Sequence, residues 1–303
     1  MPKVPYEKQA LTYEEQAQQL IDRGLITDAE TLQYRLGAVS YYRLSGYLHP
    51  FRKRDNEGKV LDAFSPGTTL EAVWDLYCFD RKLRVLILDA IERIEVSYRT
   101  KLVYTFSHRY GAFGHTEEKN LPKLEAEKYL EWRLSLVEET RRSKEAFKKH
   151  YFEKYEGDNL PLWMVAELMS MGSLLTMFNG ADPEIKKEIA SSYGIPDEVA
   201  LSWLRSLNGA RNICAHHARI WNKELGYSPM LPNKAEEWIG ENKPKQNRVG
   251  VILFICRYLL KQISQSSKWH LHVEELFNNY PNVPLDRMGL AEDWKSHLIW
   301  KHE

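Results

Sequence analysis

Five polar side chains that suit phosphate binding and proton transfer recur near residue 210 at steps of three or four residues. They are Arg205, Asn208, Asn212, His216 and Arg219. The spacing places them on one face of a helix that we predict from Pro196 to about Trp221, with apolar residues on the opposite face. A helix face that only contacts solvent favours Glu and Lys, which this face lacks. Its guanidinium and imidazole groups instead point to phosphate chemistry.

A sixth residue, Arg211, belongs to this group by type but not by position. It precedes His216 by five residues, which turns it by about 140° on an ideal helix. One intact helix therefore does not unite the two side chains. Either the helix distorts or ends near His216, or the long guanidinium reaches round, or a second copy of the chain completes the site across a twofold axis.

Cleavage of RNA without a metal requires a base for the ribose 2′-OH, an acid for the leaving 5′-oxygen and a cation beside the phosphate. Imidazole suits the first two roles, so we predict His216 as base and acid, alone or as one His216 from each of two copies. Arg211 is predicted to hold the phosphate with two hydrogen bonds. Asn212 would orient the imidazole or bind substrate, and His217 would be a second proton carrier or an RNA contact. In the competing interpretation, the adjacent histidines are satisfied structural groups.

A long helix predicted from about Thr69 to Tyr110 forms the spine of the chain. Its apolar face comprises Val73, Leu76, Leu83, Ile87, Ala90, Ile91, Ile94, Tyr98, Leu102 and Thr105. Asp80 falls on the same face, and Arg84 lies at its edge, four residues on. In one interpretation, Asp80 and Arg84 form a structural ion pair. In the other, Asp80 supports an active site as an acid.

Glu167 is the lone charge in a run from Pro161 to Phe178 that is otherwise almost entirely apolar. Such a run predicts a helix at the centre of a bundle, where a carboxylate needs a cation or a proton. Arg205 or Arg211 would supply that cation, so a structural salt bridge and a supporting catalytic role both stand.

The remaining elements indicate an all-α protein. Capping boxes at Thr12 with Glu15 and Thr27 with Glu30 predict two short helices, and the charged stretch 121–155 predicts a solvated helix or helical hairpin. Further helices are expected over 249–265 and 291–300. We divide the chain into an N-terminal helical extension (1–66), a helical core (67–222) with a charged insertion around 115–157, and C-terminal helices packed on that core (223–303).

Composition limits the partners and cofactors. Forty-two basic residues balance forty-two acidic ones among 303, so any nucleic-acid contact must come from a local patch. The three cysteines, at 78, 214 and 256, show no metal-type spacing. The pairs Cys214 with His216 and His270 with His272 lack a four-ligand pattern, so we predict neither metal nor cofactor. The first residues carry no apolar signal core and no run of about eighteen apolar residues occurs, which predicts a cytoplasmic protein without a membrane partner.

The chain resembles the Abi-like (AbiD/AbiF) abortive-infection proteins of the HEPN superfamily. The resemblance rests on Tyr41-Tyr42-Arg43-Leu44-Ser45-Gly46-Tyr47, Phe79-Asp80-Arg81-Lys82-Leu83-Arg84, Ile91-Glu92 through Arg99, Trp163 to Gly172, and Arg211-Asn212-Ile213-Cys214-Ala215-His216-His217-Ala218-Arg219-Ile220-Trp221-Asn222. HEPN nucleases carry an arginine, commonly followed by a polar residue, with a histidine four to six residues after it. That pattern selects Arg211, Asn212 and His216.

The resemblance implies a HEPN-type helical bundle with additional N- and C-terminal helices. It also implies metal-independent endoribonuclease activity that leaves a 2′,3′-cyclic phosphate, in the service of phage defence. A chain with one such motif is expected to form a homodimer with a composite site, and a structured non-coding RNA is a candidate partner besides the target RNA. Two alternatives stand: a HEPN-fold protein that binds RNA without cutting it, and a regulator that binds only protein.

Overall fold

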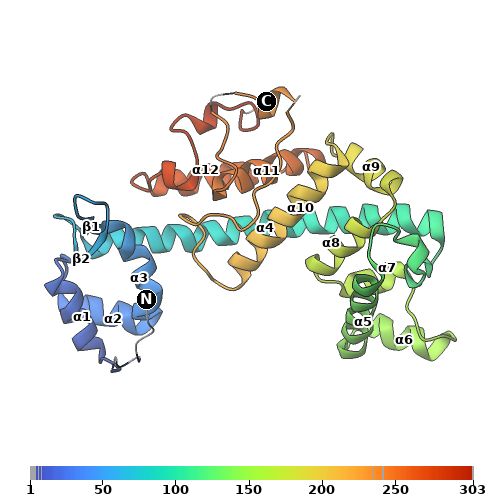
Figure 1. The fold of residues 1–303 in the computed structure, drawn as a ribbon, viewed down its shortest axis with the longest axis horizontal. Coiled ribbons are helices and arrows are strands. Elements are labelled where there is room, and N and C mark those ends of the chain that lie inside the picture. The colour runs from blue at the N-terminus through green and yellow to red at the C-terminus, as the bar shows by residue number, and fades with distance from the viewer. Residues whose placement is uncertain (1–4, 6, 8, 234, 241, 302–303) are drawn as a thin grey trace. The chain divides into compact units, whose positions relative to one another are not determined.

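The computed structural model describes residues 5, 7, 9–233, 235–240 and 242–301. It confirms an all-α fold, since the described residues form helices with only one two-stranded sheet (Figure 1). The helices are α1 (Tyr13–Asp22), α2 (Ala29–Val39), α3 (Tyr41–Leu48), α4 (Leu70–Tyr110), α5 (Ala126–Arg142), α6 (Ala146–Lys154), α7 (Leu162–Val165), α8 (Met171–Gly180), α9 (Pro183–Ser191), α10 (Asp197–Ala215), α11 (Val249–Ile263) and α12 (Trp269–Asn279). The strands β1 (Arg52–Arg54) and β2 (Val60–Phe64) pair in antiparallel orientation.

The chain divides into two compact units. The first comprises Met1–Lys82 and Asn278–Val283, and the second comprises Leu83–Phe277 and Pro284–Glu303. The long helix predicted over 69–110 is present as α4, which contributes to both units. Every residue predicted for its apolar face is buried except Thr105, which is partly exposed. Helical periodicity therefore identified this core correctly.

In the first unit, one of the two predicted capping boxes is present. Thr12 and Glu15 exchange both hydrogen bonds of the box at the start of α1. The Thr27 box was wrong: Asp28 caps α2 instead, with its carboxylate accepting from the Thr31 amide at 2.7 Å. This hydrogen bond lowers the pKa of Asp28. A carboxylate one residue closer to the helix outcompetes the Thr27 hydroxyl as the cap.

In the second unit, the run from Pro161 to Phe178 is not one helix. It divides into α7, a 3-10 turn over Ala166–Leu168, and α8. Ser170 causes the break, because its hydroxyl accepts from the Ser173 amide at 3.1 Å and begins a new helix there. Glu167, predicted to be buried at a bundle centre, lies on the intervening turn and is exposed.

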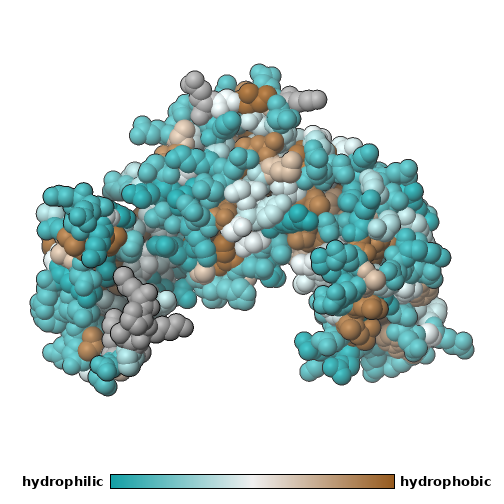
Figure 2. Space-filling view, in the orientation of Figure 1, coloured by the Kyte–Doolittle hydropathy of each residue, from teal (hydrophilic) through white to brown (hydrophobic). Residues whose placement is uncertain are grey.

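The charged stretch 121–155, predicted as a solvated helix or a helical hairpin, is helical and contains two helices, α5 and α6. Trp132, on the buried face of α5, donates its indole N–H to the carbonyl of Ser173 on α8 at 3.0 Å. Leu130, Leu134 and Val137 lie on its outer face and are more than half exposed. Figure 2 shows hydrophobic surface in the region of α5 against a mostly hydrophilic face.

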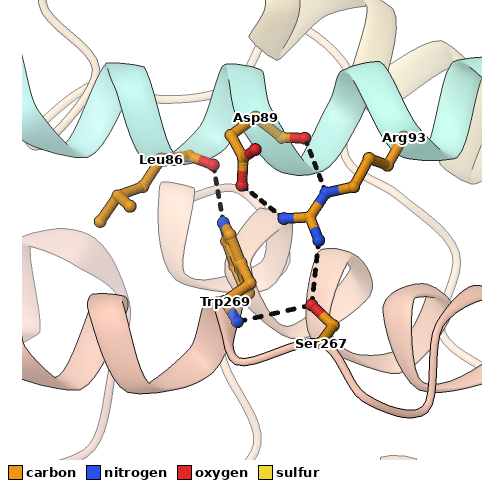
Figure 3. A network of polar contacts seen from close by, with 5 residues as sticks. All are labelled: Leu86, Asp89, Arg93, Ser267 and Trp269. Carbon is orange, nitrogen blue, oxygen red and sulfur yellow. Dashed lines mark hydrogen bonds and ion pairs between the residues drawn. The ribbon is translucent and has the colours of Figure 1, made fainter.

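The helix predicted over 249–265 is present as α11, but the one predicted over 291–300 is not. Only a 3-10 turn, Trp294–Ser296, forms there, and α12 precedes it. The start of α12 is attached to α4 by a polar network (Figure 3). The Trp269 indole donates to the carbonyl of Leu86 at 2.7 Å, and Arg93 binds both Asp89 and the Ser267 hydroxyl. No helix in the described part of the chain is long and apolar enough to cross a membrane.

Candidate functional site at the end of α10

The helix that carries the candidate catalytic residues ends at Ala215, six residues earlier than Trp221, where we predicted its end. His216 is the C-cap. The His217 amide donates to the carbonyl of Cys214 at 3.0 Å, and the Ala218 amide donates to that of Ile213, also at 3.0 Å. This pair of bonds is the Schellman motif, which satisfies carbonyls that a helix otherwise leaves without partners. The prediction of one continuous helix to about Trp221 was therefore wrong, because the helix ends near His216.

The residue in the turning position of this motif is His217. Its φ of 57° lies in the left-handed region, where a helix terminus most often has glycine. Histidine is among the side chains that tolerate this conformation best, although it still costs about 1 kcal/mol or more. The turn places both His216 and His217 on the protein surface, where both are exposed. A non-glycine residue held in this conformation is a feature typical of functional sites.

The segment after this turn leads back into the core. Ile220 and Trp221 are fully buried, and the buried guanidinium of Arg84 donates a long hydrogen bond of 3.5 Å to the carbonyl of Ala218. Arg219 lies in this segment, beyond the helix, and is partly exposed. It therefore cannot continue the helical stripe on which it was predicted.

Arg211 lies one turn before the helix end, and its positive charge acts on a carboxylate of α4. Burial raises the pKa of Glu95, and the positive charges of Arg99 and Arg211 act in the opposite direction. Arg99 binds Glu95 directly at 2.5 Å and also donates to the carbonyl of Met169 at 3.0 Å. Arg211 itself is partly exposed and donates to the side-chain oxygen of the exposed Asn212 at 3.3 Å. Glu95 is thus paired with Arg99 and also feels the positive charge of Arg211.

Arg205 and Asn208 lie further back on α10. The exposed Arg205 donates to the Asn179 side chain at 3.1 Å and to the Tyr227 hydroxyl at 3.4 Å, with its guanidinium 5.8 Å from the centre of that ring. Asn208 is partly exposed. Arg205 therefore contacts α8 through Asn179 and the loop that carries Tyr227. Among the described residues, no ion pair joins Glu167 to Arg205 or Arg211.

Asp80 belongs to the first unit, where it is fully buried and accepts from the Tyr47 hydroxyl at 2.6 Å. Sequence reasoning passed over Glu95 and Arg99 as site residues. The signal was present, because they are four residues apart on a helix, and Arg99 falls within a segment that carries the family resemblance. Among the described residues, no group of three or more His, Cys, Asp or Glu side chains is arranged to hold a metal ion.

The described residues form an all-α protein in which two adjacent histidines lie at the exposed end of α10, with Arg211 one turn earlier. The model of the Abi-like protein family matches residues 34–222, more than half of the chain, so the chain belongs to that family. No curated protein and no solved structure matches it. The matched region begins in α2 and includes the whole turn that carries His216 and His217.

Proposed function

We propose that this protein is an abortive-infection effector that protects bacteria from phage by cleaving RNA, as a metal-independent endoribonuclease of the HEPN superfamily. The observation that carries the proposal is the end of α10. Two imidazoles project there from an exposed turn, one helical turn after the guanidinium of Arg211. Membership of the Abi-like family supports the role in phage defence.

In the proposed reaction, the imidazole of His216 takes the proton of a ribose 2′-OH. The 2′-oxygen forms a bond to phosphorus while the bond from phosphorus to the 5′-oxygen breaks. A protonated imidazole, from His217 or from His216 of a second copy, gives its proton to that leaving oxygen. The products are a 2′,3′-cyclic phosphate and a free 5′-OH, with base and acid each worth about 10²–10⁴ in rate.

Arg211 would stabilise the negative charge that builds up on the phosphate oxygens as the new bond forms. Asn212, which accepts from Arg211, would hold the guanidinium in place or contact the substrate. RNA phosphates would have to compete with Glu95 for this positive charge. A cation that is already oriented loses little freedom when the phosphate binds.

The test is cleavage of a labelled single-stranded RNA in EDTA by wild type, His216→Ala and Arg211→Ala. Both substitutions are expected to remove cleavage and phage protection, with losses of at least about 10² in rate. His216→Gln serves as the isosteric control for folding. Cleavage by His216→Ala at the wild-type rate would refute the catalytic assignment. Tight RNA binding without product, and protection that survives both substitutions, would establish instead the non-cleaving RNA-binding protein.

The homodimer with a composite site has its own test. If one His216 from each copy is needed, only dimers with two intact copies cut. An equimolar mixture of wild type and His216→Ala, allowed to exchange subunits, then retains about a quarter of the activity of the same total amount of wild type. A retention of about half, as for independent sites, would refute the composite site and leave the nuclease proposal standing.

A further inference from the structure

An open cleft of about 450 Å³ lies beside Arg99, and neither the catalytic assignment nor the family match accounts for it. Two of its lining residues are large exposed aromatics: Trp163 of α7 is 49% exposed and Tyr104 of α4 is 63% exposed. The Tyr104 ring packs against His108, with ring centres 4.0 Å apart. The volume is within the range of about 300–1,000 Å³ that is typical of ligand sites.

The polar groups of the cleft have unused hydrogen-bonding capacity. Arg99 Nε and Ser107 Oγ are buried atoms that lack a hydrogen-bond partner among the described residues, and both residues line the cleft. A buried polar group without a partner is costly, so such atoms point to a ligand or to water. Glu167, which lines the cleft from the turn after α7, adds an acceptor.

The mixture of groups identifies the chemistry of the occupant. Glu167 would repel a phosphate, and Arg99 is already bound to Glu95. A flat, uncharged ring with donors and acceptors on its edge fits both the aromatic walls and the mixed polar groups. Nucleobases have this form, and they stack on exposed aromatic side chains in many proteins that bind single strands.

The cleft is also connected to the candidate catalytic residues. Arg99 lines the cleft and binds Glu95, and the charge of Arg211 acts on that same carboxylate. We propose that the cleft lined by Tyr104, Trp163, Ser107 and Arg99 holds an unpaired base of the RNA strand whose phosphate reaches Arg211. This inference rests on the proposed function in taking RNA as the ligand and Arg211 as the contact of its phosphate.

The test measures binding separately from cleavage. The probe is a fluorescent twelve-residue oligouridylate with 2′-O-methyl riboses, which has no free 2′-OH and is not cut, and a matched strand lacks all its bases. Trp163→Ala is expected to weaken binding of the base-bearing strand by about 5- to 140-fold. The same substitution should leave binding of the baseless strand unchanged. Trp163→Phe, which keeps a ring, should lose less than Trp163→Ala.

Tyr155→Ala is the matched control, because Tyr155 is 51% exposed, belongs to the same unit and lies outside the cleft. It should bind both strands as wild type does. Tyr104→Ala is the second cleft variant and should reproduce the loss even if Trp163→Ala folds poorly. Circular dichroism of each variant checks its helix content.

Two results would overturn the inference. One is wild-type affinity for the base-bearing strand in both Trp163→Ala and Tyr104→Ala. The other is an equal loss on both strands, which would mean that the aromatics shape the protein and do not stack on a base. Neither depends on catalysis. If His216→Ala loses cleavage while the cleft variants bind normally, the nuclease proposal stands and the base-binding cleft is rejected. If His216→Ala cleaves normally while the cleft variants lose binding of the base-bearing strand, the cleft stands and the catalytic assignment is rejected.

Discussion

The left-handed conformation of His217 predicts that glycine is more stable than alanine at this position, the reverse of the order expected inside a helix. Replacing His217 by Gly or by Ala removes the imidazole in both cases, so the difference between the two variants isolates the backbone. At a φ of 57°, a Cβ atom costs about 1–2 kcal/mol that glycine does not incur. Glycine also makes the unfolded chain more flexible, which lowers the stability of the glycine variant by about 0.4–1 kcal/mol and offsets part of this difference. We therefore expect His217→Gly to exceed His217→Ala in free energy of unfolding by about 1 kcal/mol.

Gly209, two turns earlier on α10, supplies the matched comparison. It has ordinary helical geometry, and a Cβ built on it meets nothing within 4 Å. Alanine there should therefore be the more stable residue, by about 0.5–1 kcal/mol. Urea unfolding followed by circular dichroism measures the three variants and the wild type. If His217→Ala proves as stable as His217→Gly while Gly209→Ala shows its expected gain, the Schellman turn described for His217 is wrong.

Three further predictions concern the same unit. Burial lowers the pKa of His115 from 6.5 to about 4. Between pH 6.5 and about 4 the unfolded state therefore binds more protons than the folded state, and the free energy of unfolding falls by on the order of 3 kcal/mol as the pH is lowered through this range. Urea unfolding at a series of pH values should show this loss reduced in His115→Gln. Trp203→Phe removes the indole that donates to the carbonyl of Met230 at 2.7 Å, and it should lower the free energy of unfolding by about 1 kcal/mol and speed amide exchange over 227–230. Glu95→Gln removes a negative charge that acts on Arg211, so fluorescence anisotropy should show binding of the uncleavable strand tightened by up to about fivefold at low salt. Weaker binding would contradict the proposal that Glu95 and the RNA phosphate compete for the charge of Arg211.

Periodicity predicted the fold where one physical effect dominates. The apolar face of α4 repeats over many turns, and burial of that face decides its structure, so its bounds were predicted to within one residue. Periodicity failed where a short polar side chain competes with the helix. Ser170 lies in an apolar run, and its hydroxyl divides that run because it satisfies an amide that would otherwise bond along the helix. Such competition depends on whether the carbonyls nearby find other partners, which the apolar pattern does not encode.

The candidate site was predicted less completely than the fold. Residue types pointed to Arg211, His216 and His217, and their catalytic roles stay predictions; the structure places both histidines on an exposed turn. Glu95 could not be assigned to them from spacing, because it lies more than a hundred residues away in the chain and approaches Arg211 only through tertiary packing. Glu167 was predicted to be buried because the run around it was predicted as one helix. The break at Ser170, which the prediction missed, leaves Glu167 on an exposed turn.

The position of the helix end bears directly on how Arg211 and His216 meet. The His216 amide still donates to the carbonyl of Asn212 at 3.0 Å, as within a helix, so its Cα follows the course of α10 although its own φ of −85° and ψ of 11° are no longer helical. The chain leaves that course only at His217. Ending the helix therefore does not by itself cancel the offset of about 140° between Arg211 and His216. Three arrangements remain: the long guanidinium of Arg211 reaches round to His216, His217 takes one of the proton-transfer roles, or a second copy supplies the facing imidazole. The mixing experiment separates the last arrangement from the first two, because a site completed within one chain predicts the half-maximal result.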